Sequence, residues 1–170
     1  MAGIPLVRLR IDTFAQLGNN ALTGNMRIGN KAQKGKLPNT FVPGRNIIFL
    51  TFAAAYAYAH NIGHLITGVC ETDYSGYPDC RLRTIRSLEK TLCLGLDHRI
   101  KIHTPLIHLT KAASIGLAEK IGALPALAHS HTCYTGVFPP CGKCMACKLR
   151  AKGFREAGVP DPLIKKRPVR

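Results

Sequence analysis

The chain has 170 residues, about the size of one domain, and its 46% apolar and 19% charged residues are typical of a globular protein with a buried core. It carries 24 lysines and arginines against 9 aspartates and glutamates, a net charge of +15 that favours phosphate-bearing partners. No apolar run reaches the roughly 18–20 residues of a membrane helix, and we expect no signal peptide. These features predict a cytoplasmic protein whose cysteines are not disulfide-bonded.

The hydrophobic pattern predicts strands and helices in alternation. Residues 5–11 alternate apolar and polar side chains, as in a strand, and residues 17–39 are rich in Gly, Asn and Lys, as in a long loop. We then expect a buried helix, a strand, an amphipathic helix, a strand and two more helices, over residues 46–60, 64–69, 81–94, 100–107, 110–121 and 145–156. The tail after Gly158 is expected to be irregular.

This order of elements predicts an α/β fold, a parallel sheet with helices on both faces. Ligands of such sheets bind at the carboxyl ends of the strands. Residues 68–80 follow a predicted strand directly and are therefore a candidate site. Three strands make a thin sheet, which is a first indication that part of the domain is missing.

Four cysteines near the C-terminus have the spacing of a metal site. They form the pattern Cys133-x7-Cys141-x2-Cys144-x2-Cys147. Zinc prefers four ligands in a tetrahedron, and a Cys-x2-Cys step lets one turn present two thiolates. Gly142 permits the tight turn that such a step needs. The pattern favours a structural zinc ion, and an iron–sulfur cluster or a set of redox thiols are the alternatives.

Two other segments carry more polar chemistry than a core needs. In residues 38–46, the run Gly44-Arg45-Asn46 at a helix start brings backbone amides, the positive end of the helix dipole and a guanidinium together, as a phosphate site requires. A loop with a solvent-facing arginine is the alternative. Residues 68–81 hold three carboxylates, two tyrosines and a serine. They are suited to hydrogen-bond a flat heterocycle, although a plain polar turn would have the same composition.

Together these segments resemble the 7-cyano-7-deazaguanine synthase (QueC) family of queuosine biosynthesis. The resemblance rests on residues 18–23, 39–46, 67–81, 103–106, 110–112 and 132–134, and on the Cys-x2-Cys-x2-Cys-Lys-Leu-Arg run. It covers nearly the whole chain, and its most specific part is Tyr74-Ser75-Gly76-Tyr77-Pro78-Asp79-Cys80.

The resemblance implies the adenine-nucleotide α-hydrolase-like fold. In this interpretation residues 1–130 are a partial nucleotide-binding α/β domain, and residues 131–170 are a zinc-binding segment packed on it. The implied reaction is that of a carbon–nitrogen ligase, in which 7-carboxy-7-deazaguanine, ammonia and ATP give the 7-cyano compound. Activation of the carboxylate requires ATP with Mg²⁺ and a stabilised phosphate.

The resemblance also implies site residues, and no catalytic group among them is identified. Gly44, Arg45 and Asn46 are expected near the nucleotide phosphates, with Lys111 as a further phosphate contact. The residues expected at the deazapurine end are Glu71, Asp73, Tyr74, Ser75, Asp79 and Arg81. A carboxylate there can accept the guanine-type N–H donors, and an arginine can meet the substrate carboxylate.

One motif of the family does not occur in this sequence. The Ser-Gly-Gly-x-Asp-Ser loop, which holds the ATP phosphates, is absent. We therefore expect this chain to be a fragment, or a split subunit whose partner brings the loop. We expect little synthase activity from the chain alone. A homodimer is also possible. The alternatives are a zinc-stabilised module that binds nucleic acid or a protein partner, and a related ATP-dependent tRNA-modifying enzyme.

Overall fold

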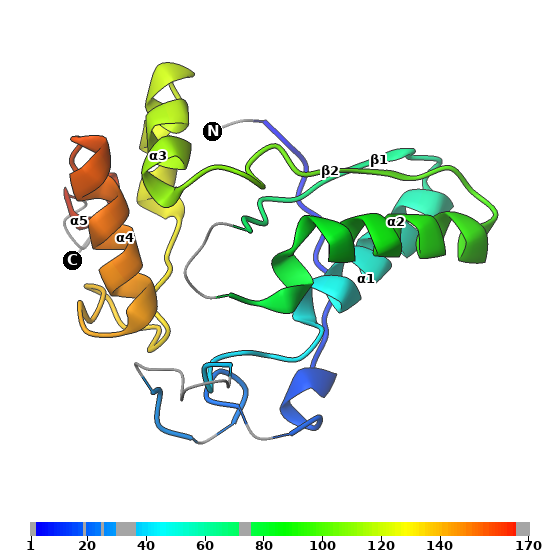
Figure 1. Cartoon of the computed structure of the whole chain (residues 1–170), viewed down its shortest axis with the longest axis horizontal. Coiled ribbons are helices and arrows are strands. Elements are labelled where there is room, and N and C mark those ends of the chain that lie inside the picture. Colours follow the sequence, from blue (N-terminus) through cyan, green and yellow to red (C-terminus); the bar gives the residue numbers. More distant parts are fainter. Residues whose placement is uncertain (1–2, 19, 25, 30–36, 72–75, 166–170) are drawn as a thin grey trace. The chain divides into compact units, whose positions relative to one another are not determined.

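The computed structural model describes residues 3–18, 20–24, 26–29, 37–71 and 76–165 (Figure 1). They belong to two compact units, one of residues 43–110 and one in which residues up to 42 join residues from 111 onward. The division into segments 1–130 and 131–170 stays a prediction. Among the described residues, no helix is both long and apolar enough to span a bilayer.

The unit of residues 43–110 contains a small parallel sheet. Strand β1 (His64–Ile66) pairs with strand β2 (Lys101–His103), and Leu65 lies opposite Ile102. Both strands were predicted, but each has three residues and is shorter than expected. After β2 the chain turns at Pro105, which cannot donate to a strand ladder.

Two helices, α1 (Arg45–Ala59) and α2 (Leu82–Leu96), close to their predicted bounds, form the core with this sheet. A short 3-10 helix, η2 (Pro78–Cys80), precedes α2. The core cluster contains Leu50 and Ala54 from α1, Ile85 and Leu92 from α2, and Ile100 and Ile102 from the second strand and its approach.

Within this unit, the described helices α1 and α2 pack on one face of the sheet. Leu65 and Ile102, which are paired and so share a face, belong to the cluster built with α1 and α2. The side chains of His64, Ile66 and His103 alternate with them and are exposed. The described residues of this unit therefore confirm an α/β arrangement with a parallel sheet, which has two of the three predicted strands and has α1 and α2 on one face.

The predicted strand over residues 5–11 is not formed. No strand is assigned there, and Leu6 and Leu9 are 75% and 52% exposed. A strand is stabilised by hydrogen bonds to a neighbour, and none of the described residues pairs with this segment. The chain next forms a 3-10 turn, η1 (Thr13–Ala15), which buries Phe14.

The described parts of residues 17–39 are loops, as predicted, held by two asparagines. The Oδ1 of Asn20 accepts the N–H groups of Leu22 and Thr23 at 2.9 and 3.0 Å. The side chain of Asn39 bonds the Gly29 N–H and the Arg27 carbonyl at 3.0 and 2.9 Å.

From residue 111 onward, the regular elements that the structure describes in the second unit are helices. Its elements are α3 (Lys111–Lys120), the 3-10 helix η3 (Leu124–His129), α4 (Met145–Ala157) and α5 (Pro162–Lys165). The bounds of α3 and α4 confirm their prediction to within one residue. The single turn of α5 corrects the expectation of an irregular tail. It begins at Pro162, whose fixed φ suits a first helical position, and the Asp161 carboxylate caps the Leu163 N–H at 2.9 Å.

Candidate functional site

The four predicted metal ligands come together at the start of α4. The Sγ atoms of Cys133, Cys141, Cys144 and Cys147 all lie within 4.8 Å of one another. Zn–S bonds of about 2.3 Å in a tetrahedron place sulfur atoms about 3.8 Å apart. The Cys141 and Cys147 sulfurs are already 4.0 Å apart. The donor set and its dimensions therefore fit one four-coordinate zinc ion.

The local backbone explains how so short a segment presents these thiols. Gly142 has φ +67°, a left-handed conformation that bends the chain between Cys141 and Cys144. The Cys144 N–H then donates to the Cys141 sulfur, and the Cys141 N–H donates to the Cys133 sulfur, each at 3.4 Å. Both bonds favour the thiolate over the thiol.

The pKa values of Cys133 and Cys147 are shifted in opposite directions. Burial raises the pKa of Cys133, but hydrogen bonds from Thr135 and from the Cys141 amide outweigh it and lower the pKa to about 5. Burial and the neighbouring Cys144 raise the pKa of Cys147 to about 12. A second buried thiolate is costly beside the first, so a cation is needed for the four thiols to ionise together.

Behind the cysteines lies a buried arginine that motif reading missed. Arg150, one turn after Cys147, donates from Nε and Nη2 to the two carboxylate oxygens of Asp161 at 2.6 and 2.7 Å. Its Nη1 donates to the carbonyl and hydroxyl of Ser130, both at 2.9 Å, and Nη2 also reaches the Leu127 carbonyl at 3.0 Å. All five guanidinium donors are used. They join η3, α4 and the start of α5.

In the other unit, residues 68–81 place two of the predicted carboxylates at helix starts. Glu71 accepts the N–H of Leu82, the first residue of α2, at 3.1 Å. Asp79, only 4% exposed, accepts both the backbone N–H and the side-chain amide of Asn46 at 2.9 and 3.0 Å. Negative charge at a helix N-terminus is stabilising. These contacts fix Glu71 and Asp79 at the starts of α2 and α1.

The other predicted pocket residues are placed as follows. Arg81 directly precedes α2, and its guanidinium is within 3.5 Å of the Gly76 carbonyl. Asp73, Tyr74 and Ser75 lie outside the described residues. The structure therefore describes the two ends of this predicted site and not its middle.

The residues that were predicted to bind the nucleotide phosphates belong to both units. Gly44, with φ +68°, is the N-cap of α1, and Arg45 and Asn46 are its first two residues. The Asn46–Asp79 hydrogen bonds directly connect the predicted phosphate and deazapurine sets. Lys111 belongs to the other unit, where it begins α3 and lies beside Gly153 of α4.

Comparison with known proteins gives consistent results. The family model described as "Queuosine biosynthesis protein QueC" matches residues 1–158. A 7-cyano-7-deazaguanine synthase of Chromobacterium violaceum is 57% identical over 168 residues, which are 98% of this chain and 72% of the relative. The synthase of Laribacter hongkongensis is 55% identical over 166 residues, 96% of this chain and 72% of that protein. The synthase of Rhodopseudomonas palustris strain BisA53 is 52% identical over 159 residues, which are 87% of this chain and 65% of that protein.

Proposed function

The chain belongs to the QueC family of queuosine biosynthesis proteins, and we propose that it takes part in converting 7-carboxy-7-deazaguanine, ammonia and ATP to 7-cyano-7-deazaguanine. The observation that carries this proposal is the 57% identity to a 7-cyano-7-deazaguanine synthase over 98% of the chain. We further propose that the chain adopts the adenine-nucleotide α-hydrolase-like fold of the implied family.

The metal in this proposal is one structural zinc ion on Cys133, Cys141, Cys144 and Cys147. Four thiolates fill a tetrahedral site and leave no position for water or substrate, so the ion supplies folding energy and no step of the reaction. The support is the mutual distance of at most 4.8 Å between the four sulfurs. The zinc would hold the start of α4 against the segment that contains Cys133.

The substrate site in this proposal is the loop from Glu71 to Arg81. Glu71 and Asp79 are each bonded to a helix start. Asp73, Tyr74 and Ser75, which lie between them in the sequence, are the proposed contacts of the deazapurine. Asp79 is buried and its bonded oxygen is occupied by Asn46, so its part is to position the loop. Arg81 is the proposed partner of the substrate carboxylate.

The nucleotide end is proposed at Gly44, Arg45 and Asn46, with Lys111 as a further phosphate contact. Arg45 is the cation of the first group, and the Asn46 amides bond Asp79. Turnover with ATP and Mg²⁺ also needs a phosphate-binding loop of the Ser-Gly-Gly-x-Asp-Ser kind, which none of the 170 residues supplies. A partner or a further segment would bring it.

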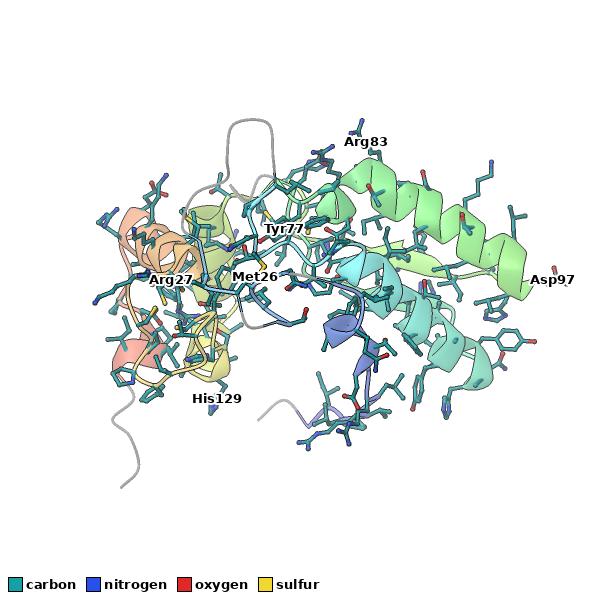
Figure 2. All side chains as sticks on the ribbon, turned by 90° about the horizontal axis from the view of Figure 1, so that it is seen from below. Met26, Arg27, Tyr77, Arg83, Asp97 and His129 are labelled. Carbon is teal, nitrogen blue, oxygen red and sulfur yellow. The ribbon has the colours of Figure 1, made fainter. Side chains whose placement is uncertain are left out.

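Calorimetric titration of the zinc-loaded chain with 7-carboxy-7-deazaguanine tests the substrate assignment. We expect saturable binding that weakens at least ~10-fold in Arg81→Ala, since loss of a charged hydrogen-bond partner costs roughly 1.5–3 kcal/mol. Arg83→Ala is the matched control, because Arg83 projects from the first turn of α2 and is exposed (Figure 2). Absence of binding, or equal affinity in both variants, would refute the assignment.

A turnover assay separates binding from catalysis. With ATP, Mg²⁺ and ammonia added, we expect the chain alone to form little of the nitrile while it still binds the carboxylate substrate. Robust turnover by the isolated chain would contradict the requirement for an external phosphate loop.

A further inference from the structure

The face of the β1–β2 sheet that no described helix covers carries two histidines in direct contact. His64 opens β1 and His103 ends β2, and the parallel register sets His103 opposite Ile66, two residues beyond His64 on the same face. The Nδ1 of His64 and the Nε2 of His103 are 3.0 Å apart. Both side chains are exposed, and Ile66 beside them is 77% exposed.

Two imidazole nitrogens at this distance suit chelation of a metal ion. Metal–imidazole bonds are about 2.0–2.1 Å long, so an ion bound to both nitrogens at a 3.0 Å separation subtends roughly 91–97°. A tetrahedral angle of about 109° would need the nitrogens roughly 3.3–3.4 Å apart. The observed spacing therefore favours neighbouring positions of a square-planar or octahedral ion.

We propose that His64 and His103 form a second metal site, which binds a first-row transition-metal ion such as Ni²⁺ or Cu²⁺ through two adjacent imidazoles. Imidazole nitrogen is a preferred ligand of these ions, whereas Mg²⁺ and Ca²⁺ prefer oxygen. Water fills the remaining positions, because both rings face solvent. The site differs from the cysteine cluster in ligand type, in geometry and in its openness.

The proton shared by the two rings does not prevent an ion from binding to both nitrogens. In the metal-free contact one ring donates its proton to the other nitrogen. When an ion binds, that ring's proton leaves the contact and its other nitrogen takes up a proton from water, so both rings stay neutral ligands. Lys101 lies on the same face of β2, but its ammonium is paired with Glu89 at 2.9 Å, which offsets its charge near the ion.

The test is titration of untagged, zinc-loaded protein with Ni²⁺, followed by calorimetry and by NMR of the histidine ring protons. Zinc on the four cysteines keeps Ni²⁺ from those thiols. We expect one saturable Ni²⁺ per chain, with the ring signals of His64 and His103 broadened together by the paramagnetic ion. His64→Asn and His103→Asn should each weaken binding at least ~10-fold, since a single imidazole loses the effective concentration of the second.

His108→Asn is the matched control, because His108 is exposed and lies five residues after His103 in the same unit. It should bind Ni²⁺ as the unaltered chain does, and the circular dichroism of all three variants should be unchanged. Non-saturating Ni²⁺ binding would overturn the proposal. So would equal affinity in His64→Asn and His108→Asn, or broadening of one ring of the pair without the other.

Discussion

Arg150 and Asp161 form a bidentate ion pair, with distances of 2.6 and 2.7 Å between guanidinium nitrogens and carboxylate oxygens. The two side chains are only 11% and 6% exposed. The guanidinium also lies over the ring of Phe154, 5.1 Å from its centroid. Because Arg150 is three residues after Cys147 on α4, the pair fixes the helix that holds the last cysteine of the cluster.

Loss of one partner of this pair should destabilise the protein strongly. In Asp161→Ala, Arg150 keeps its charge in a buried site without a counter-charge, and α5 loses its cap. We expect the free energy of unfolding to fall by roughly 3–5 kcal/mol. Urea denaturation of the zinc-loaded protein measures it. Glu156→Ala, which breaks the exposed 3.6 Å contact to Lys152, should cost less than about 0.5 kcal/mol. Equal costs would contradict the structural role of Arg150.

Metal removal should act on the unit that contains α4. A chelator that extracts zinc leaves the thiols of Cys133 and Cys147 buried without a cation, so the melting temperature of the protein should fall. Elemental analysis should give one zinc per chain before treatment. Cys144→Ser should weaken zinc binding more than ~10-fold, because it removes a ligand.

Cys70→Ser is the control for that measurement. The Cys70 thiol donates to the Leu109 carbonyl at 2.8 Å in the other unit, and a serine hydroxyl can make the same bond. Zinc content should therefore be unchanged in this variant. Zinc-free protein with the same melting temperature as loaded protein would exclude a structural metal.

The buried carboxylate of Asp79 should stabilise the start of α1. Asp79→Ala leaves the backbone and side-chain amides of Asn46 without their acceptor, and we expect a cost of about 1–3 kcal/mol. Asp79→Asn keeps one carbonyl oxygen for them and should cost less. Thermal unfolding followed by circular dichroism compares the two. Glu119→Ala, at an exposed position of α3, serves as a control and should be neutral.

How far the sequence predicts this structure depends on how local each feature is. The helix over 46–60 and the cysteine cluster were predicted well, because an apolar run after Gly44 and a Cys-x2-Cys step each specify their own geometry. The strands were predicted too long and 5–11 wrongly as a strand, because strand formation depends on a partner elsewhere in the chain.

Contacts between distant residues carry no sequence signal of this kind. The hydrogen bonds between Asn46 and Asp79 join residues 33 apart, and the contact between His64 and His103 joins residues 39 apart. Arg150 closely follows the cysteine run, which could have drawn attention to it, but no motif marks its pairing with Asp161, 11 residues later. The middle of the pocket loop, with Asp73 and Tyr74, stays a prediction.

Glu89 should make stability depend on pH. Burial raises the pKa of its carboxyl, but the Ile102 N–H at 2.7 Å and the Lys101 ammonium outweigh this, and the pKa is lowered from 4.5. A lowered folded-state pKa means that the stabilisation is present above the unfolded-state value and is lost as the pH falls through the folded-state value.

The matched variant for this effect is Glu89→Gln. Urea denaturation at about pH 7 should show a loss of roughly 1–2 kcal/mol, since a charge-assisted bond to β2 is replaced by a neutral one. At a pH below the lowered folded-state pKa of Glu89 the two proteins should converge, because Glu89 becomes protonated. A constant difference at both pH values would show that Glu89 is not the titrating group.

Helices α3 and α4 pack closely at Gly153. A Cβ added at Gly153 would lie 2.9 Å from the Lys111 Cγ and 3.1 Å from the Ile115 Cδ1. Gly153→Ala should gain about 1 kcal/mol of helix propensity. Overpacking costs roughly 1–3 kcal/mol, so we expect a net loss of stability as the helices separate. Ala151→Gly, at an exposed position of the same helix, should lose only the propensity. If Gly153→Ala raised the urea midpoint instead, the helices would have room to spare at this contact, and the close approach of α3 to α4 would not limit the residue at position 153.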